Sequence, residues 1–256
     1  MNDYASGPGE IEIANGIARS AGDAGACANQ YVCLLCQPQC CDPERLEVFE
    51  PAAKRRQSYR RGEVLFRAGD PFDFVYAVRS GSVKTSISTD DGRVQVTGFH
   101  APGDLLGLSA LSTREYSCEA RALETTSVCK IAIACFEELT ETEPAIRSEV
   151  MRAMSNQIRH NESCMLSLGK RSAEERLASY LLGLSRRFAR RCFSATEFHL
   201  TMSRADIGNF LGIAEETVCR ILARFHANGI IESQRRFVVL RDCKRLAIIA
   251  AGRQGS

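Results

Sequence analysis

The stretch Arg204-Ala-Asp-Ile-Gly-Asn-Phe-Leu-Gly-Ile-Ala-Glu-Glu-Thr-Val-Cys-Arg-Ile-Leu222 decides the fold of the C-terminal part of the chain. Its apolar residues recur at helical spacing on both sides of Gly212, which predicts amphipathic helices over 203–210 and 215–227. Glycine has the conformational freedom that a tight turn between two helices requires. The side chains expected to hold both helices to one core are Ala205, Ile207, Leu211, Val218, Ile221 and Leu222. This arrangement predicts a helix-turn-helix.

Three side chains are expected to face outward near the start of the second helix: Glu216, Cys219 and Arg220. In a helix-turn-helix this end of the second helix lies in the major groove of DNA. Arginine can bond O6 and N7 of guanine together, and glutamate can accept a hydrogen bond from N4 of cytosine. We therefore expect these residues to contact double-stranded DNA. The alternative is a helical hairpin on whose surface Glu216 and Arg220 form only an i,i+4 ion pair.

The residues around this motif favour the DNA interpretation. A further helix is predicted over 174–188, and alternation over 231–241 predicts a hairpin, which together indicate a winged helix-turn-helix. Residues 170–256 hold 16 Lys and Arg residues against eight Asp and Glu residues, a net charge of +8. The rest of the chain holds 17 against 23, a net charge of −6. Because the two parts carry net charges of opposite sign, the basic C-terminal part indicates a polyanion as partner.

Residues 57–134 instead alternate with a period of two, in short runs separated by glycine-containing turns. The runs expected to form strands are 64–66, 74–78, 82–88, 94–99 and 121–133. The dipeptide Asp91-Gly92 lies between two of these runs and is a strong signal for a hairpin. Many short strands with such turns predict an antiparallel barrel or sandwich.

Residues 144–168 return to helical spacing and carry one apolar stripe. The stripe contains Ile146, Val150, Met154, Ile158, Met165 and Leu168. A helix of this length usually has a partner for its stripe, which predicts a coiled-coil-like homodimer. The alternative is that the stripe packs along the barrel of its own chain.

The chain has 256 residues and 12 cysteines, and five of the cysteines fall between positions 27 and 41. Residues 1–11 carry acids and lack the basic-then-apolar pattern of a secretory signal, and no run of 18 apolar residues predicts a membrane span. We therefore expect a cytoplasmic protein in a reducing compartment, where disulfides are rare. Clustered thiols in that setting indicate metal binding.

Several segments carry a resemblance to a known family: Leu65-Phe-Arg-Ala-Gly-Asp, Tyr76-Ala-Val-Arg-Ser-Gly, Gly98-Phe-His-Ala-Pro-Gly-Asp-Leu-Leu-Gly, Ala122-Leu-Glu-Thr, Ala173-Glu-Glu-Arg-Leu-Ala, Leu184-Ser-Arg-Arg-Phe-Ala and Leu200-Thr-Met-Ser. They resemble the Crp/Fnr superfamily of bacterial transcription regulators, on its oxygen-sensing Fnr side. The resemblance implies an α+β fold with an N-terminal antiparallel β-roll (cupin-like, of the cyclic-nucleotide-binding-domain type). The implied divisions are a mobile segment (1–26), a cysteine loop (27–41), the roll sensor (42–143), a dimerisation helix (144–169) and a winged helix-turn-helix (170–256).

The resemblance also implies which DNA sequence the recognition helix contacts and whether the roll binds a cyclic nucleotide. In the Fnr type the recognition helix has the pattern Glu-x-x-Ser-Arg and reads a TTGAT-like half-site; Cys219 replaces the serine here, which leaves the outermost base open. Cyclic AMP receptor proteins bind the ribose with a glutamate and the cyclic phosphate with an Arg-Ser pair. Leu108 and Tyr116-Ser117 stand at those positions, and neither leucine nor tyrosine supplies these contacts. No cyclic nucleotide is therefore expected to bind.

A [4Fe-4S] cluster, held by three N-terminal cysteines and one cysteine of the roll, is the cofactor that the Fnr type implies. Cys129, in Val128-Cys-Lys-Ile, matches the internal ligand, with Lys130 in place of an acid. The favoured ligand set is Cys27, Cys33, Cys36 and Cys129, and in the alternative Cys40 or Cys41 replaces Cys27. A structural zinc site, or no metal, is the other interpretation. The cysteines at 118, 135, 164, 192 and 243 are expected to be small buried side chains.

The implied function is an oxygen- or redox-responsive regulator that binds a two-fold site as a dimer while its cluster is intact and controls anaerobic or microaerobic genes. Asn161 stands in the dimer helix where the Fnr type has an acid, so the cluster-free dimer is expected to be less disfavoured. Asp90, Asp91 and Gly92 match the turn through which the family contacts RNA polymerase. A repressor that only occludes a promoter is the alternative. The four histidines have no clustered acid or nucleophile, so no enzyme is expected.

Overall fold

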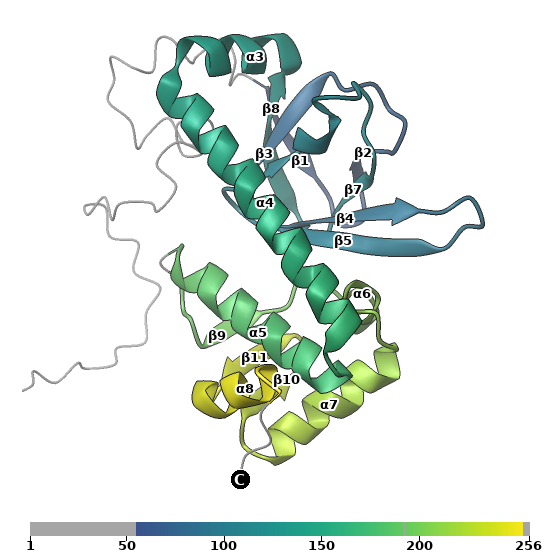
Figure 1. The fold of residues 1–256 in the computed structure, drawn as a ribbon, viewed down its shortest axis with the longest axis vertical. Helices are drawn as coiled ribbons and strands as arrows, with labels where there is room; N and C mark the ends of the chain where they lie inside the picture. The colour runs from purple at the N-terminus through teal and green to yellow at the C-terminus, as the bar shows by residue number, and fades with distance from the viewer. Residues whose placement is uncertain (1–54, 192, 253–256) are drawn as a thin grey trace, which may run out of the picture.

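The computed structural model describes residues 55–191 and 193–252. The predicted mobile segment (1–26) and the cysteines at 27, 33, 36, 40, 41 and 192 lie outside the described residues. The same holds for the stretch that begins Asp42-Pro-Glu, a pattern that predicts the start of a short helix. Within them, antiparallel sheets are followed by a long helix and a small helical domain (Figure 1).

The N-terminal half is built from two four-stranded antiparallel sheets. The first has the order β1 (Arg55–Tyr59), β8 (Thr126–Ala132), β3 (Phe74–Ser80) and β6 (Leu105–Leu106). The second has the order β2 (Val64–Phe66), β7 (Glu119–Ala122), β4 (Val83–Ser88) and β5 (Val94–His100). Gly92, with a φ of 81°, turns β4 into β5 as the Asp91-Gly92 signal predicts. This half is the β-roll.

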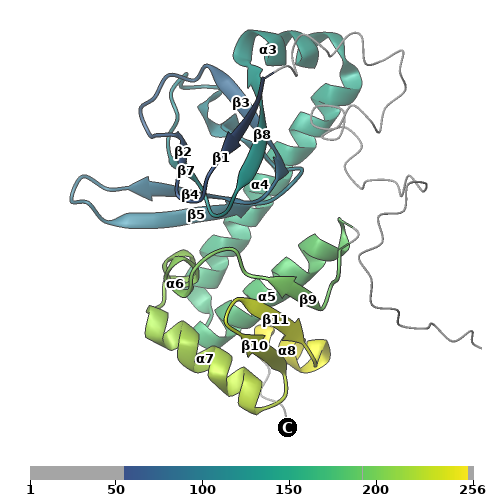
Figure 2. The same cartoon turned by 180° about the vertical axis from the view of Figure 1, so that it is seen from behind.

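Two helices leave the roll in sequence. α3 (Ile133–Thr142) continues directly from β8 and buries Phe136 and Leu139 in the core of the roll. α4 (Pro144–Lys170) begins with Pro144, whose fixed φ suits the first helical position. It runs from α3 past both sheets to the C-terminal helices (Figures 1 and 2).

The apolar stripe of α4 divides along its length. Ile146 and Val150 are buried in the roll's own core at 2% and 6% exposure, and Met154 packs partly buried against that core. This corrects the expectation that Ile146 and Val150 contact a partner, because side chains enclosed by their own roll have no surface to share. The stripe is exposed further along, with Ile158 at 58% and Met165 at 72%.

The C-terminal part contains the expected helix-turn-helix. Its elements are α5 (Ala173–Ala189), β9 (Glu197–His199), α6 (Arg204–Leu211), α7 (Glu215–Ala227), β10 (Ile231–Gln234), β11 (Phe237–Leu240) and α8 (Cys243–Ala250). β10, β11 and β9 form a three-stranded antiparallel sheet beside the helices. The α+β fold with antiparallel strands, a long helix and a winged helix-turn-helix is thus confirmed.

Apart from a short 3-10 helix over Leu108–Ala110, five elements lie outside the predicted runs: β1, β6, α3, β9 and α8. The stretch 121–133, expected to form the last strands, contributes the end of β7 and nearly all of β8. The predicted small buried thiols are only partly buried: Cys118, Cys135, Cys164 and Cys243. Among the cysteines at described positions, Cys129 is the one that is buried.

Candidate functional site

The turn of the helix-turn-helix depends on two glycines. Gly212 ends α6 in the left-handed conformation, with a φ of 63°, as the sequence predicts. Gly208 was not singled out from the sequence, yet a Cβ there would lie 2.6 Å from the carbonyl oxygen of Ile213. The backbone N–H of Ile213 donates to the Gly208 carbonyl at 2.9 Å, so the turn folds directly against α6.

α7 presents the predicted DNA-reading residues to solvent. Val218, Ile221 and Leu222 are buried at 4% exposure or less, which fixes one face of the helix to the core. Glu216, Cys219 and Arg220 are all exposed on the other side. Among the described ion pairs none joins Glu216 to Arg220, so the surface-pair alternative finds no support in this geometry. The structure therefore brings the three residues together on one accessible face.

A basic hairpin follows the recognition helix. β10 and β11 are joined by Arg235 and Arg236, and Arg235 is exposed with a φ of 53°, unusual for a residue other than glycine. The guanidinium of Arg204, at the start of α6, donates to the Arg235 carbonyl at 2.8 Å and to the Ser233 hydroxyl at 3.2 Å. These bonds hold the tip of the wing beside the helix-turn-helix.

The predicted polymerase turn forms the tip of the β4–β5 hairpin, where Asp90, Asp91 and Gly92 are exposed. Within the tip, the Arg93 guanidinium is 2.7 Å from an Asp91 carboxylate oxygen. The Thr89 hydroxyl donates to the same carboxylate, and this bond, with those from Arg93, lowers the pKa of Asp91. Asp91 is thus engaged within its own turn, whereas the Asp90 side chain forms no hydrogen bond or ion pair with the described residues.

Cys129 lies in β8 between β1 and β3, opposite Arg56 on one side and Ala77 on the other. Its side chain is 2% exposed. Strand alternation places Lys130 on the other face of the sheet, where its ammonium lies 4.1 Å from the centre of the Phe74 ring. The positive charge that replaces the family's acid is therefore directed away from the Cys129 thiol.

Of the positions that correspond to nucleotide ligands in cyclic AMP receptor proteins, Tyr116 is buried in the roll, Leu108 is partly buried and Ser117 is exposed. Leu108 begins a short 3-10 helix, η2 (Leu108–Ala110), and the hydroxyl oxygens of Ser109 and Ser117 are 3.3 Å apart. Tyr116 is 3% exposed and stacks on Phe66 with 3.9 Å between ring centres. Its hydroxyl donates to the Phe74 carbonyl at 2.5 Å. The interior at this point is filled by aromatic rings.

Residues 55–191 and 193–252 lack two kinds of feature, a clustered metal site and a membrane-spanning helix. No group of three His, Cys, Asp or Glu side chains in residues 55–191 and 193–252 is placed to hold a metal ion. Over the same residues, no helix combines the length and apolar character that a membrane crossing requires. Of the four favoured cluster ligands, only Cys129 belongs to the described part of the chain.

Two family models match the chain in succession. Residues 56–143 match the cyclic nucleotide-binding domain, and residues 175–249 match the Crp-like helix-turn-helix domain. Between them lies the whole of α4.

Relatives of known name match nearly the whole length. The transcriptional activator protein anr of Pseudomonas aeruginosa is 45% identical over 226 residues, covering 88% of this chain and 93% of its own. The anaerobic regulatory protein of Pasteurella multocida is 39% identical, covering 88% and 82%. Among solved structures, FixK2 from Bradyrhizobium japonicum is 34% identical, with a TM-score of 0.71 over 79% of this chain and 98% of that one. With a β-roll, a long helix and a winged helix-turn-helix in this order, the chain belongs to the Crp/Fnr family of transcriptional regulators.

Proposed function

We propose that this protein is an oxygen-responsive DNA-binding regulator of anaerobic genes, which binds a two-fold TTGAT-like site as a homodimer. The observation that carries the DNA-binding part is the exposure of Glu216, Cys219 and Arg220 on one face of α7. Relatives that share about two fifths of its residues are named as transcriptional activator and anaerobic regulatory proteins, which supports the anaerobic assignment.

The sensor part of the proposal is a [4Fe-4S] cluster held by Cys129 and the N-terminal set Cys27, Cys33 and Cys36. Cys129 suits a ligand role because its thiol is shielded from solvent on a central strand. The neighbouring strand β1 is the point at which residues 1–54 join the roll, and Arg56 in β1 is paired with Cys129. A cluster bound here supplies iron and sulfide that oxygen oxidises. Thiolates are the ligands such clusters take.

Dimerisation is proposed through the exposed half of α4. Met151, Ile158 and Met165 recur every seven residues and are 59%, 58% and 72% exposed. Met154, Asn161 and Leu168 fall between them at steps of three and four, which is the a/d spacing of a coiled coil. Met151 was not among the residues chosen from the sequence, although its seven-residue distance from Ile158 was visible there.

Cyclic nucleotides are proposed not to be the signal. Tyr116 and Phe66 fill the roll where the phosphate-binding pair of cyclic AMP receptor proteins is aligned, and a buried phosphate needs a cation that this position lacks. Titration of the protein with cyclic AMP, followed by intrinsic tyrosine fluorescence or calorimetry, is expected to give no saturable signal. Saturable binding at micromolar nucleotide would contradict this part of the proposal.

The cluster is tested by purifying the protein without oxygen and measuring its visible spectrum, iron and acid-labile sulfide. The expected result is a brown protein with about four iron atoms per chain, lost in Cys129→Ser and retained in the matched control Cys243→Ser. A colourless protein with one zinc ion would overturn the oxygen sensor and leave the DNA-binding assignment intact.

DNA binding is tested by fluorescence anisotropy on a labelled duplex with two inverted TTGAT-like half-sites. Arg220→Ala is expected to weaken binding by about 1–3 kcal/mol per half-site and to relax the preference at the contacted base. Arg224→Ala is the matched control, because that guanidinium pairs with Glu174 of α5. Equal losses in the two variants would contradict base reading by Arg220.

Activation is proposed in preference to occlusion of a promoter, because the Asp90-Asp91-Gly92 turn is exposed at the tip of a long hairpin. The double variant Asp90→Ala/Asp91→Ala is expected to bind DNA normally and to lose transcription in a reconstituted assay. Unchanged transcription would favour the repressor alternative.

A further inference from the structure

The winged helix-turn-helix domain, here called the reader domain, comprises α5 to α8. Besides the covalent connection through α4, it contacts the roll along an interface between β4–β5 and α5–α6, which we call the seam. Val96, Phe99 and Leu123 belong to the roll, yet they pack into the hydrophobic core of the C-terminal part and are 4%, 7% and 7% exposed. Phe99 lies 5.3 Å from Phe210 of α6 and 6.1 Å from Tyr180 of α5, measured between ring centres. The two domains therefore share one apolar core.

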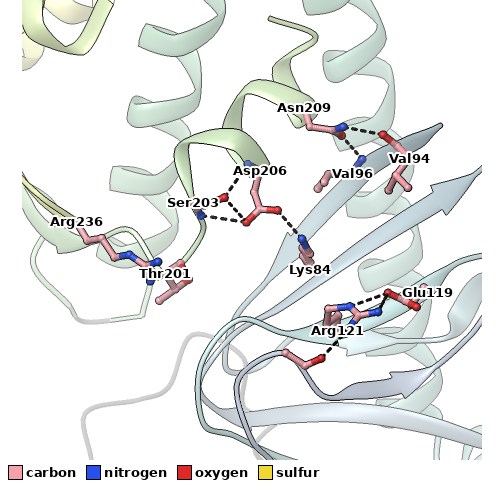
Figure 3. A network of polar contacts seen from close by, with 11 residues as sticks. Lys84, Val94, Val96, Glu119, Arg121, Thr201, Ser203, Asp206, Asn209 and Arg236 are labelled. Atoms are coloured by element: carbon pink, nitrogen blue, oxygen red, sulfur yellow. Dashed lines mark hydrogen bonds and ion pairs between the residues drawn. The ribbon is translucent and has the colours of Figure 1, made fainter. Parts of the chain in front are cut away.

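Asn209 of α6 pairs with the outer edge of β5 as a neighbouring strand would (Figure 3). Its side-chain oxygen accepts from the Val96 N–H at 2.5 Å, and its amide nitrogen donates to the Val94 carbonyl at 2.7 Å. The side chain of Gln95 donates to the Asn209 carbonyl at 2.7 Å. An asparagine amide offers one donor and one acceptor at the spacing of a peptide group, so it satisfies an edge that would otherwise be open.

Charged groups flank this contact. The Lys84 ammonium of β4 lies 2.5 Å from an Asp206 carboxylate oxygen of α6, and both side chains are mostly buried (Figure 3). Farther along, the Asp104 carboxylate accepts from Arg187 of α5 at 2.6 Å and from Arg191, which follows the end of α5, at 2.7 Å. Partly buried pairs of this kind are directional, so they fix an orientation more than they add stability.

The seam is the last in a series of packed contacts that connect α4, the proposed dimer helix, to the recognition helix α7. Gly208 lets the turn before α7 pack directly on α6, α6 is attached to β5, and the roll encloses Ile146 of α4. The only break in helical backbone between α4 and α5 is at Arg171 and Ser172, which have extended ψ angles of 146° and 163°. Without the seam, these two residues would be the joint about which the reader turns.

We propose that the β5–α6 seam is the positioning device that sets the separation and relative rotation of the two recognition helices, and so the half-site spacing that the dimer reads. The positioning residues are Asn209, Lys84 and Asp206. The inference rests on the proposed dimeric DNA binding and adds the property that selects the spacing. One added base pair moves a half-site by about 3.4 Å and about a tenth of a helical turn, which a rigid dimer cannot follow.

The test compares Asn209→Ala/Lys84→Gln with the wild-type protein, both purified without oxygen. Asp206 is left unchanged because it also caps α6 through Ser203. Binding is measured on duplexes whose inverted half-sites are separated by the best spacing and by one base pair more or less. Wild-type protein is expected to prefer the best spacing by about tenfold, which is the usual cost of a misplaced base contact, and the variant by about twofold.

Two controls separate positioning from folding. Ser88→Ala lies on β4 at an exposed position and should keep the wild-type preference for spacing. Discrimination between a correct and a mutated half-site should be the same in all three proteins, because α7 is unchanged. The variant Asn209→Ala/Lys84→Arg keeps a positive charge opposite Asp206, so it should retain more of the spacing preference than Asn209→Ala/Lys84→Gln does.

The outcomes are distinct. If wild-type protein binds no inverted repeat, the proposed function fails and the seam is not at issue. If wild-type protein binds and the double variant retains a tenfold preference for spacing, the seam does not position the reader and the inference is wrong. A variant that loses base discrimination together with spacing preference would show a folding defect and would also overturn it.

Discussion

At the scale of single residues, Gly208 is the strongest local constraint in the reader domain. An added Cβ would lie 2.6 Å from the Ile213 carbonyl oxygen, and backbone on both sides leaves neither group free to move. We expect Gly208→Ala to destabilise the protein by about 2–4 kcal/mol, as overpacked sites do. Urea denaturation measures this, and Gly183→Ala is the control, since nothing lies within 4 Å of a Cβ there. A neutral Gly208→Ala would contradict the close turn.

His100 adds a pH dependence to the seam. Burial is the largest cause that lowers the pKa of His100, to about 4. Its ring Nε2 lies 3.1 Å from the Thr85 hydroxyl oxygen. The charged and titratable groups that face it are Asp104, Arg187, Arg191 and His160. Asp104 favours the protonated ring and the other three oppose it, so the ring is neutral at physiological pH.

The sign of the effect on stability follows from the two states. An unfolded histidine has a pKa of about 6.5, so between about pH 6.5 and 4 the unfolded chain binds a proton that the native ring excludes. Stability is therefore full above about pH 6.5 and falls as the pH drops toward 4. Urea midpoints at several pH values should fall less steeply in His100→Gln than in the wild type. His226→Gln, at an exposed position on α7, should keep the wild-type slope; identical slopes for all three proteins would refute the assignment.

A residue's role could be predicted from the sequence when it depends on neighbouring residues, and not when it depends on a distant segment of the chain. Gly212 was predictable because a helix that ends in a turn needs a left-handed residue at its C-terminus. The exposure of Glu216 and Arg220 followed from helical spacing alone. Gly208 and Asn209 were not predictable, because their constraints come from Ile213 folding back and from a strand more than a hundred positions away. The partner of a side chain across a domain seam leaves no periodic signal.

At the scale of elements, α4 serves two surfaces with one stripe. Its first turns are enclosed by the roll at Ile146 and Val150, Met154 is partly buried against the same core, and from Ile158 onward the apolar side chains of the stripe face solvent. We expect Ile158→Glu to shift the protein from dimer to monomer, because it places a charge at the centre of the apolar stripe of α4. Sedimentation velocity without oxygen measures the shift. Asn156→Glu adds the same charge to an exposed position off the stripe and should remain dimeric.

Thermal stability distinguishes this loss of dimer from misfolding. Ile158 is 58% exposed within one subunit, so its replacement should cost the isolated fold little. A monomeric Ile158→Glu with a normal circular dichroism spectrum supports dimerisation through α4. A dimeric Ile158→Glu would assign the dimer to another surface.

The elements that the sequence did not predict have local periodic signals that are too short or are masked by their neighbours. β6 and β9 are two and three residues long, too short for two-residue alternation to stand out. α3 follows β8 without a turn residue, so the apolar run through Ile131 and Ile133 masks the change of period. α8 is an eight-residue helix capped by Asp242 beyond the expected hairpin. The long α4 was predictable from its sustained helical spacing, and the paired α6 and α7 from the apolar spacing on both sides of Gly212.

At the scale of the whole molecule, the seam makes the roll and the reader parts of one cooperative structure. Two domains joined only by a linker unfold independently, whereas domains that share buried side chains stabilise each other. Phe99 links the roll to two helices of the reader domain, since its ring contacts Tyr180 of α5 and Phe210 of α6. The β4–β5 hairpin thus carries the predicted polymerase turn at its tip and the reader domain along its edge, so the proposed DNA and polymerase contacts would be held in a fixed relation.

Calorimetry tests this cooperativity directly. Wild-type protein should unfold in a single transition, and Phe99→Ala, which removes about 3–5 kcal/mol of buried contact, should separate it into two, with the reader melting first. Phe66→Ala is the matched control, because Phe66 lies entirely in the core of the roll. It should lower the transition temperature of the roll by a similar loss of packing without separating the reader from it. Two transitions already present in the wild-type protein would show that the shared core does not couple the domains, whereas a single transition that only shifts in Phe99→Ala would place the coupling in the polar contacts of Asn209 and Lys84.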